Sequence, residues 1–107
     1  MVYVTERVLY ADNRPYVLPD SLDELQGPQS GVIVLPESIA WTGRRTYDLD
    51  NESQVVIAYE RILEESQSPR DLQDHISRSI LTRVWRRLYL PARLRRAWTQ
   101  RFPELQA

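Results

Sequence analysis

The fold is decided where the sequence reads NESQVVIAYERILEES, from Asn51 to Ser66. At 100° per residue, its apolar side chains gather on one helical arc of about 120°, which consists of Val55, Val56, Tyr59, Ile62 and Leu63. Charged residues take the opposite side, and Asp50 or Asn51 is placed to cap the N-terminus. The pattern predicts an amphipathic helix. Ile57 is its exception, because it projects from the charged face and so indicates a contact outside the chain.

Upstream of this helix the sequence favours strands and turns. Residues 7–10 and 16–18 are rich in β-formers and flank a cluster of turn residues, so they predict a hairpin. Val32 to Leu35 is an apolar run between Gly31 and Pro36, which predicts a strand buried on both faces. Residues 44–48 predict a further strand. Ser21 and Glu24 fit a capping box, which predicts one or two helical turns.

Downstream, two further helical segments are predicted. Ser68 and Pro69 open a helix that runs toward Leu90, with an interruption near Ser77. Pro91 opens another, in which Leu94, Trp98 and Phe102 stack at i, i+4 and i+8. The expected fold is therefore α+β, with a small N-terminal antiparallel sheet packed with three to four C-terminal helices. Residues 1–107 form a single domain, mainly strands and turns over 1–50 and mainly helices over 51–107.

Charge is divided unevenly along the chain, although the net charge is only −1. Residues 1–74 carry 14 acids and 6 arginines, whereas residues 75–107 carry 8 arginines and one acid. Helical phasing puts the apolar side chains of residues 78–90 on one face and predicts a basic surface on the other, which continues into the next helix and comprises Arg83, Arg86, Arg87, Arg93, Arg95 and Arg96. Three anionic partners are open for it: the acidic body of the same chain, an acidic protein, or nucleic acid.

Catalytic and metal-binding patterns are weak. Without cysteine, the chain has no thiolate nucleophile, disulfide or Cys-type zinc site. Asp71, His75 and Ser79 share one helical stripe and imitate a relay, but no Gly-x-Ser-x-Gly elbow accompanies them. The run from Asp48 to Asp50 resembles a magnesium-binding pair but lacks the preceding Gly-Ser turn. We therefore expect no enzyme, no catalytic residues, no metal and no cofactor.

Two further features concern location and binding. The longest apolar run is four residues, and the N-terminus does not have the pattern of a signal peptide, so a cytoplasmic protein without membrane contact is expected. Trp41 stands in a predicted loop beside Arg44 and Arg45, and loop Trp and Arg residues are frequent interface anchors. Trp41 is therefore a candidate second contact.

One resemblance extends over nearly the whole chain. The segments that carry it are 5–10, 18–22, 31–36, 47–50, 88–91, 95–98 and 101–105, which read TERVLY, LPDSL, GVIVLP, YDLD, LYLP, RRAW and RFPEL. They resemble a family of small, largely uncharacterised proteins of high-GC bacteria, similar to the partner encoded beside a nucleotidyltransferase-like protein of the abortive-infection toxin class. The resemblance implies an antitoxin or accessory role.

These observations lead to one functional hypothesis and one alternative. The hypothesis is a non-enzymatic protein-binding module, antitoxin-like, that neutralises or regulates a nucleotidyltransferase-type enzyme through the basic surface, with Trp41 and Ile57 as further contacts. The alternative is a nucleic-acid-binding regulator that uses the same arginines. Homodimerisation through the helices is a further option.

Overall fold

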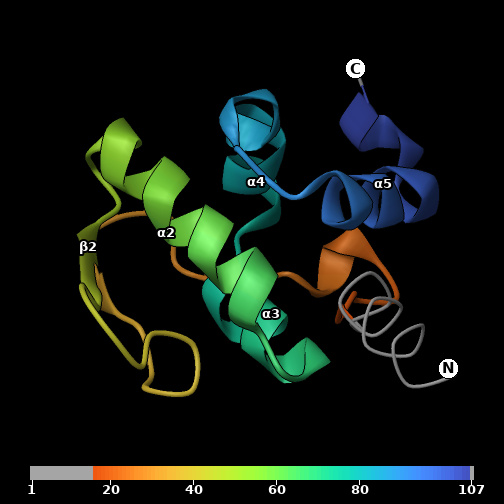
Figure 1. The fold of residues 1–107 in the computed structure, drawn as a ribbon. Helices are drawn as coiled ribbons and strands as arrows, with labels where there is room; N and C mark the ends of the chain where they lie inside the picture. The colour runs from red at the N-terminus through yellow and green to blue at the C-terminus, as the bar shows by residue number, and fades with distance from the viewer. Residues whose placement is uncertain (1–15, 107) are drawn as a thin grey trace, which may run out of the picture.

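The computed structural model describes residues 16–106 and has an α+β fold (Figure 1). Within this range a two-stranded antiparallel sheet, β1 (Val32–Val34) and β2 (Thr46–Asp48), precedes four α-helices. The helices are α2 (Glu52–Glu65), α3 (Pro69–His75), α4 (Arg78–Val84) and α5 (Ala92–Arg101), and short 3₁₀ helices span Leu22–Glu24, Trp85–Arg87 and Pro103–Gln106. The predicted α+β class is confirmed.

The predicted N-terminal hairpin is only partly covered. Its first strand, residues 7–10, lies outside the described residues. Residues 16–18, the second strand, have no regular secondary structure, so that part of the prediction is wrong. These three residues instead pack, half-buried, against the core.

Helix α2 forms as its pattern predicts. The Asn51 side chain accepts hydrogen bonds from the amides of Ser53 and Gln54, at 3.0 and 3.3 Å, so Asn51 rather than Asp50 is the N-cap. The buried side chains are Val55, Ala58, Tyr59, Ile62 and Leu63. Ile57 is 50% exposed, as expected for a residue on the charged face. One face of α2 therefore supplies the centre of the core, against β2 and α3.

A short extended segment separates α3 from α4, which confirms the predicted interruption near Ser77. The Ser77 amide donates to the buried Tyr59 hydroxyl at 2.9 Å. Alongside, the Gln26 and Gly27 amides donate to the carbonyls of Gln73 and Ile76, both at 2.9 Å. The break thus exists because its backbone groups bond to neighbouring segments rather than within one helix. The second part ends earlier than predicted, in the 3₁₀ helix Trp85–Arg87.

Helix α5 is attached to the rest of the molecule by aromatic rings. Trp98 lies between Trp85 and Phe102, with ring centroids 6.3 and 5.6 Å apart. Leu94 and Trp98 are fully buried. The predicted stack at i, i+4 and i+8 is therefore the inner face of α5, and its other faces are left for charged side chains.

The strand β1 differs from its prediction. Side chains alternate across the sheet, so Ile33 faces inward with the buried Tyr47, its cross-strand partner. Val32 and Val34 point outward and are 66% and 61% exposed. The prediction of a strand buried on both faces is wrong, because within residues 16–106 the sheet has helices on one face only. β2 is also shorter than predicted, since it begins at Thr46 rather than at Arg44.

The capping box at Ser21 is half formed. The Ser21 hydroxyl accepts from the Asp23 amide at 3.1 Å, which caps a single 3₁₀ turn. The Glu24 carboxylate accepts from the Gln73 side chain at 3.0 Å instead of closing the box. This turn is therefore held partly by α3.

No helix in the described part of the chain combines the length and the apolar character that a membrane span requires.

Candidate partner-binding surface

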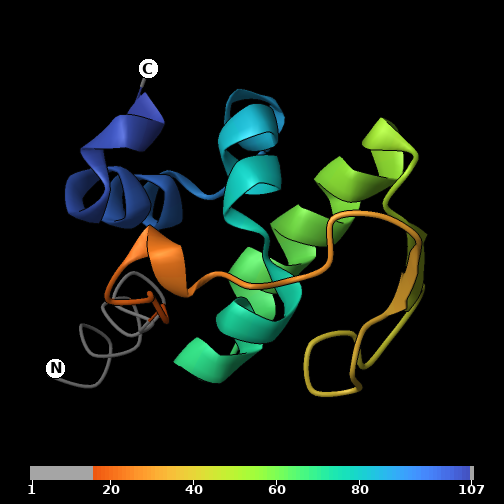
Figure 2. The same cartoon turned by 180° about the vertical axis from the view of Figure 1, so that it is seen from behind.

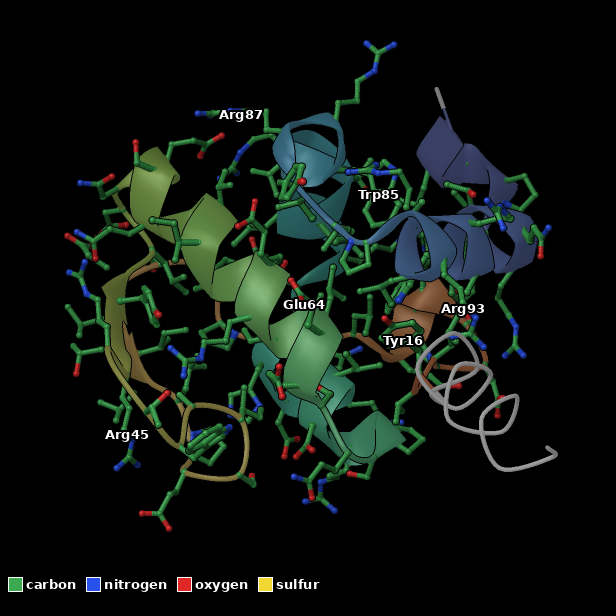
Figure 3. The ribbon with its side chains drawn as sticks, in the orientation of Figure 1. Tyr16, Arg45, Glu64, Trp85, Arg87 and Arg93 are labelled. Carbon is green, nitrogen blue, oxygen red and sulfur yellow. The ribbon has the colours of Figure 1, made fainter. Side chains whose placement is uncertain are left out.

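Two of the predicted binding arginines are ion-paired inside the molecule. Arg83 and Arg87 both contact Glu52, the first residue of α2, with N···O distances of 2.8 and 3.4 Å (Figure 3 shows Arg87). The hydrogen bond from Arg83 lowers the pKa of Glu52, and the charges of both arginines act in the same direction. Glu52, at the start of α2, thus neutralises part of the positive charge of the C-terminal arginines.

Two further C-terminal arginines also meet acids of the body. Arg78 pairs with Asp23 and lies 3.5 Å from Glu104, and Arg101 lies 3.9 Å from Asp20. Acids of the same chain therefore pair with Arg78, Arg83, Arg87 and Arg101. Glu60, another acid of the body, accepts the Tyr89 amide at 2.7 Å.

Arg95 is used within the fold. Its guanidinium lies over the Trp85 ring, 4.8 Å from the centroid, and donates to the backbone carbonyls of Trp85 and Leu88. It is half-buried. These contacts connect the end of the 3₁₀ helix Trp85–Arg87 to α5. Arg95 therefore holds the short linker that leads into α5, the helix that also carries Arg93 and Arg96.

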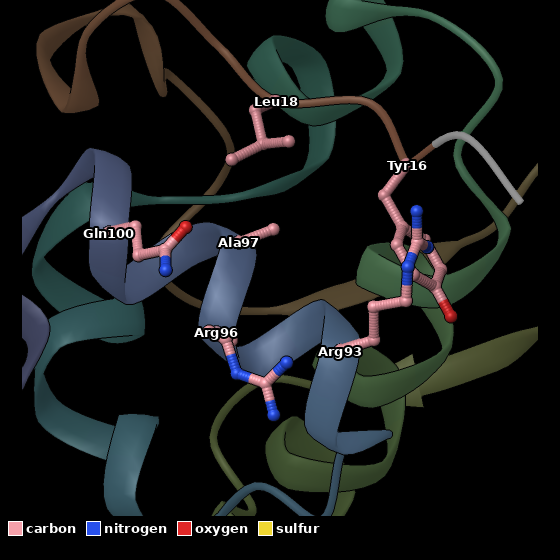
Figure 4. Close-up of a pocket in the computed structure, with 6 residues that line it drawn as sticks. All are labelled: Tyr16, Leu18, Arg93, Arg96, Ala97 and Gln100. Atoms are coloured by element: carbon pink, nitrogen blue, oxygen red, sulfur yellow. The ribbon is translucent and has the colours of Figure 1, made fainter. Parts of the chain in front are cut away.

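Arg93 and Arg96 line a pocket of about 450 Å³ on the outer side of α5 (Figure 4). They stand one turn apart on one helical stripe, which continues to Ala97 and Gln100. Tyr16 and Leu18 form the opposite wall. The Arg93 guanidinium lies over the Tyr16 ring, 5.6 Å from its centroid, and Figure 4 shows the two groups overlapping.

The chemistry of this pocket favours a carboxylate or another small oxyanion. Its lining includes two arginines and a glutamine, and no acidic side chain of the described residues lines it. Stacking on Tyr16 holds the Arg93 guanidinium against the wall of the pocket. The volume fits one or two side chains of a partner.

The remaining predicted contacts lie elsewhere. Arg86 is exposed and forms no ion pair within the described chain. Trp41 is 70% exposed in the loop between β1 and β2, which the Arg61 side chain ties to α2 through the carbonyls of Thr42 and Arg44. Ile57 precedes Arg61 by one turn of α2. Both views place the hairpin across α2 from α5 (Figures 1 and 2), so the structure does not bring Trp41 together with the arginine pocket.

The residues that resemble a catalytic relay or a magnesium-binding pair in the sequence are not arranged as such sites in the structure. His75 bonds through Nδ1 to the backbone carbonyl of Asp71 at 2.8 Å, not to its carboxylate, and Ser79 belongs to the next helix, where it bonds to Ser77. Asp48 ends β2 and accepts the Asp50 amide at 2.9 Å, which is a turn interaction. Among residues 16–106 no group of three His, Cys, Asp or Glu side chains is placed to hold a metal ion.

The sequence interpretation missed four of the pocket's lining residues, Tyr16, Leu18, Ala97 and Gln100. Gln100 could have been found, because it shares the α5 stripe of Arg93 and Arg96. Tyr16 could not, because only the folded chain brings residue 16 against α5.

No family model, no curated protein and no solved structure matches this chain. Function is therefore inferred from the surface residues themselves.

Proposed function

We propose that this chain is a protein-binding module that captures an acidic segment of a partner protein at the α5 pocket. The observation that carries the proposal is the alignment of Arg93, Arg96 and Gln100 along one stripe of α5, facing Tyr16 across a concave surface. A carboxylate seated there accepts hydrogen bonds from guanidinium and amide donors at once. Arg86, exposed in the preceding 3₁₀ helix Trp85–Arg87, adds further positive charge to the C-terminal part of the chain.

A protein partner fits these contacts better than nucleic acid does. A nucleic-acid surface needs a continuous row of cations that follows the phosphates. Here Arg78, Arg83 and Arg87 are occupied by acids of the same chain, which interrupts such a row. The α5 pocket is a local, concave feature rather than an extended row of cations, and such a pocket suits one or two acidic side chains.

The specific form of the proposal is an antitoxin-like partner of a nucleotidyltransferase-type enzyme. Such an enzyme is acidic where it holds its metal ions. A cationic helix docked at that site opposes entry of the metal and the nucleotide through charge and bulk. The chain itself contributes binding and no chemical step.

Co-expression with the neighbouring gene product, followed by co-purification at physiological salt, tests the proposal. We expect the two proteins to elute together. The variant Arg93→Gln/Arg96→Gln should weaken the complex at least about tenfold, since it removes two charge-assisted contacts. Arg70→Gln is the matched control, because Arg70 is an exposed arginine on α3, away from the pocket. Separate elution, or equal losses in both variants, contradicts the proposal.

A duplex DNA titration separates the alternative. A nucleic-acid regulator would bind with a log–log salt slope of about −0.9 per phosphate contact. Such binding, lost in Arg93→Gln/Arg96→Gln and accompanied by no protein complex, would replace the protein-binding proposal.

A further inference from the structure

The outer edge of β1 carries unused backbone groups. Leu35 donates to the Arg45 carbonyl and Leu49 to the Gly31 carbonyl, both at 2.8 Å, so residues 31, 33 and 35 direct their polar groups at β2. In an antiparallel pair the intervening residues direct theirs the other way. The N–H and C=O groups of Val32 and Val34 therefore point out of the sheet, and nothing within residues 16–106 bonds to them.

The other edge of the sheet is closed. The Asp48 amide donates to the Gln54 side chain at 2.8 Å, and the Thr46 carbonyl accepts from Arg44 at 2.8 Å. The β1 edge has no such cover, and its two outward side chains are apolar and more than 60% exposed. An open edge of this kind, with no charge on it, is a template for another strand.

We propose that β1 pairs with β1 of a second copy of this chain, antiparallel about a two-fold axis at Ile33. Val32 then lies opposite Val34 of the second copy, and each such pair exchanges two N–H···O=C bonds. The sequence Val-Ile-Val reads alike in both directions, so the strand is self-complementary. The product is a four-stranded sheet in the order β2, β1, β1, β2, with two Val–Val pairs on its outer face.

The distribution of charge favours a second copy of this chain as the partner of β1, and it favours antiparallel pairing. Residues 28–36 contain no charged side chain, so a second copy meets no repulsion along the strand. The ends of the hairpin differ in sign, with Arg44 and Arg45 at one end and Asp48 and Asp50 at the other. Antiparallel pairing places the basic end of one copy beside the acidic end of the other. Pro36 lacks an N–H and ends the pairing, which confines the contact to a short strip.

The strip is small, so the dimer is expected to be weak. A standard stable interface buries about 1,200 Å² or more, and three residues of paired strand fall well short of that. Sedimentation of the full chain should therefore show a monomer at about 10 µM and a growing dimer fraction toward about 1 mM.

Charged substitutions at Val32 and Val34 test the register of the proposed strand pairing. Val32→Lys/Val34→Lys puts like charges opposite each other in both pairs and should weaken the dimer about tenfold or more. Val32→Glu/Val34→Lys puts opposite charges together and should bring affinity back to within about threefold of the unaltered chain. Both valines are exposed, so circular dichroism should show the native fold in each variant. Tyr89→Lys is the control, since Tyr89 is 87% exposed and outside the hairpin.

The outcomes are separable from those of the protein-binding proposal. Arg93→Gln/Arg96→Gln should dimerise normally, because α5, which carries both arginines, lies across α2 from the hairpin (Figure 2). A chain that stays monomeric at all concentrations overturns the inference. So does a dimer that Val32→Lys/Val34→Lys leaves intact, or one that Val32→Glu/Val34→Lys does not restore. Monomers that pair β1 with an extended peptide instead would assign the edge to another occupant.

Discussion

At the scale of single residues, the Tyr59 hydroxyl is the polar group on which the α3–α4 break depends. It is fully buried and accepts the Ser77 amide at 2.9 Å. Burial raises the pKa of Tyr59 to about 12, although the hydrogen bond from Ser77 and the charge of Arg83 act in the opposite direction. The fold therefore requires the neutral phenol.

Alkaline pH should destabilise the protein through this group. Below pH 10 the phenol is protonated in both states and contributes no pH dependence. Between pH 10 and about 12 the unfolded chain loses the proton and the folded chain keeps it, so the free energy of unfolding should fall by about 2 to 3 kcal/mol. The chain has no lysine, so no ammonium side chain adds to the pH dependence in this window.

Urea unfolding at several pH values measures this effect. Tyr59→Phe should be less stable at neutral pH by about 1 to 3 kcal/mol, because it leaves the Ser77 amide without an acceptor. It should also lose most of the decline above pH 10. An unchanged decline in Tyr59→Phe would assign the alkaline effect to other tyrosines.

Gly27 is required by space. A Cβ at this position would lie 2.6 Å from the Ile76 amide nitrogen and 2.7 Å from the His75 carbonyl oxygen, both backbone atoms. We expect Gly27→Ala to lower the free energy of unfolding by about 2 to 3 kcal/mol. Ser30→Ala, in the exposed part of the same segment, should change it by less than about 0.5 kcal/mol. Equal, small effects would show that the segment shifts away from α3 without cost.

At the scale of elements, the local sequence pattern predicts secondary structure correctly where a segment buries one face against the elements next to it. The period of α2, its cap region and the break near Ser77 follow from side-chain spacing and from N-cap residues. The β1 strand was also located correctly. Its burial was not, since whether a second layer covers Val32 and Val34 depends on the packing of the whole chain.

The candidate site, too, could be predicted from the sequence only in part. The sequence predicted that Arg93, Arg95 and Arg96 continue the basic surface onto α5. Arg93 and Arg96 line the pocket, whereas Arg95 contacts Trp85 and Leu88 within the fold. The sequence also placed Arg83 and Arg87 on the basic surface and left open whether the acidic body of the same chain pairs with them; in the structure Glu52 pairs with both. Partners that are distant in sequence, such as Glu52 and Tyr16, carry no local pattern. Which arginines lie at the pocket could therefore not be read from the sequence alone.

The position of α5 depends on Trp98. This side chain is fully buried between Trp85 and Phe102. Trp98→Ala should reduce the free energy of unfolding by about 3 to 5 kcal/mol, measured by urea unfolding. Trp41→Ala is the matched control, because Trp41 is 70% exposed and should cost less than about 0.5 kcal/mol. A comparable loss in both variants would mean that the Trp41 loop is part of the core.

At the scale of the whole molecule, the division of charge becomes an internal contact. Arginines of the basic C-terminal part form ion pairs with Glu52, Asp23 and Asp20 of the acidic N-terminal part. The opposite charges that give the chain its near-neutral net charge therefore also lie next to each other in the folded molecule. These pairs are exposed to solvent and contribute little to stability. Their larger effect is on what the arginines present to a partner, because a paired guanidinium attracts an acidic surface less strongly.

Glu52 should therefore restrain partner binding. Glu52→Gln releases Arg83 and Arg87 and should raise the association rate with the acidic partner several-fold at low salt, with the gain shrinking as salt increases. Glu37→Gln is the matched control, since it makes the same change in net charge on an exposed loop residue of the hairpin. Stopped-flow association at a series of salt concentrations compares the two variants. If both accelerate binding equally, the gain reflects net charge alone. If only Glu52→Gln does, the rate is controlled by the two arginines that Glu52 holds.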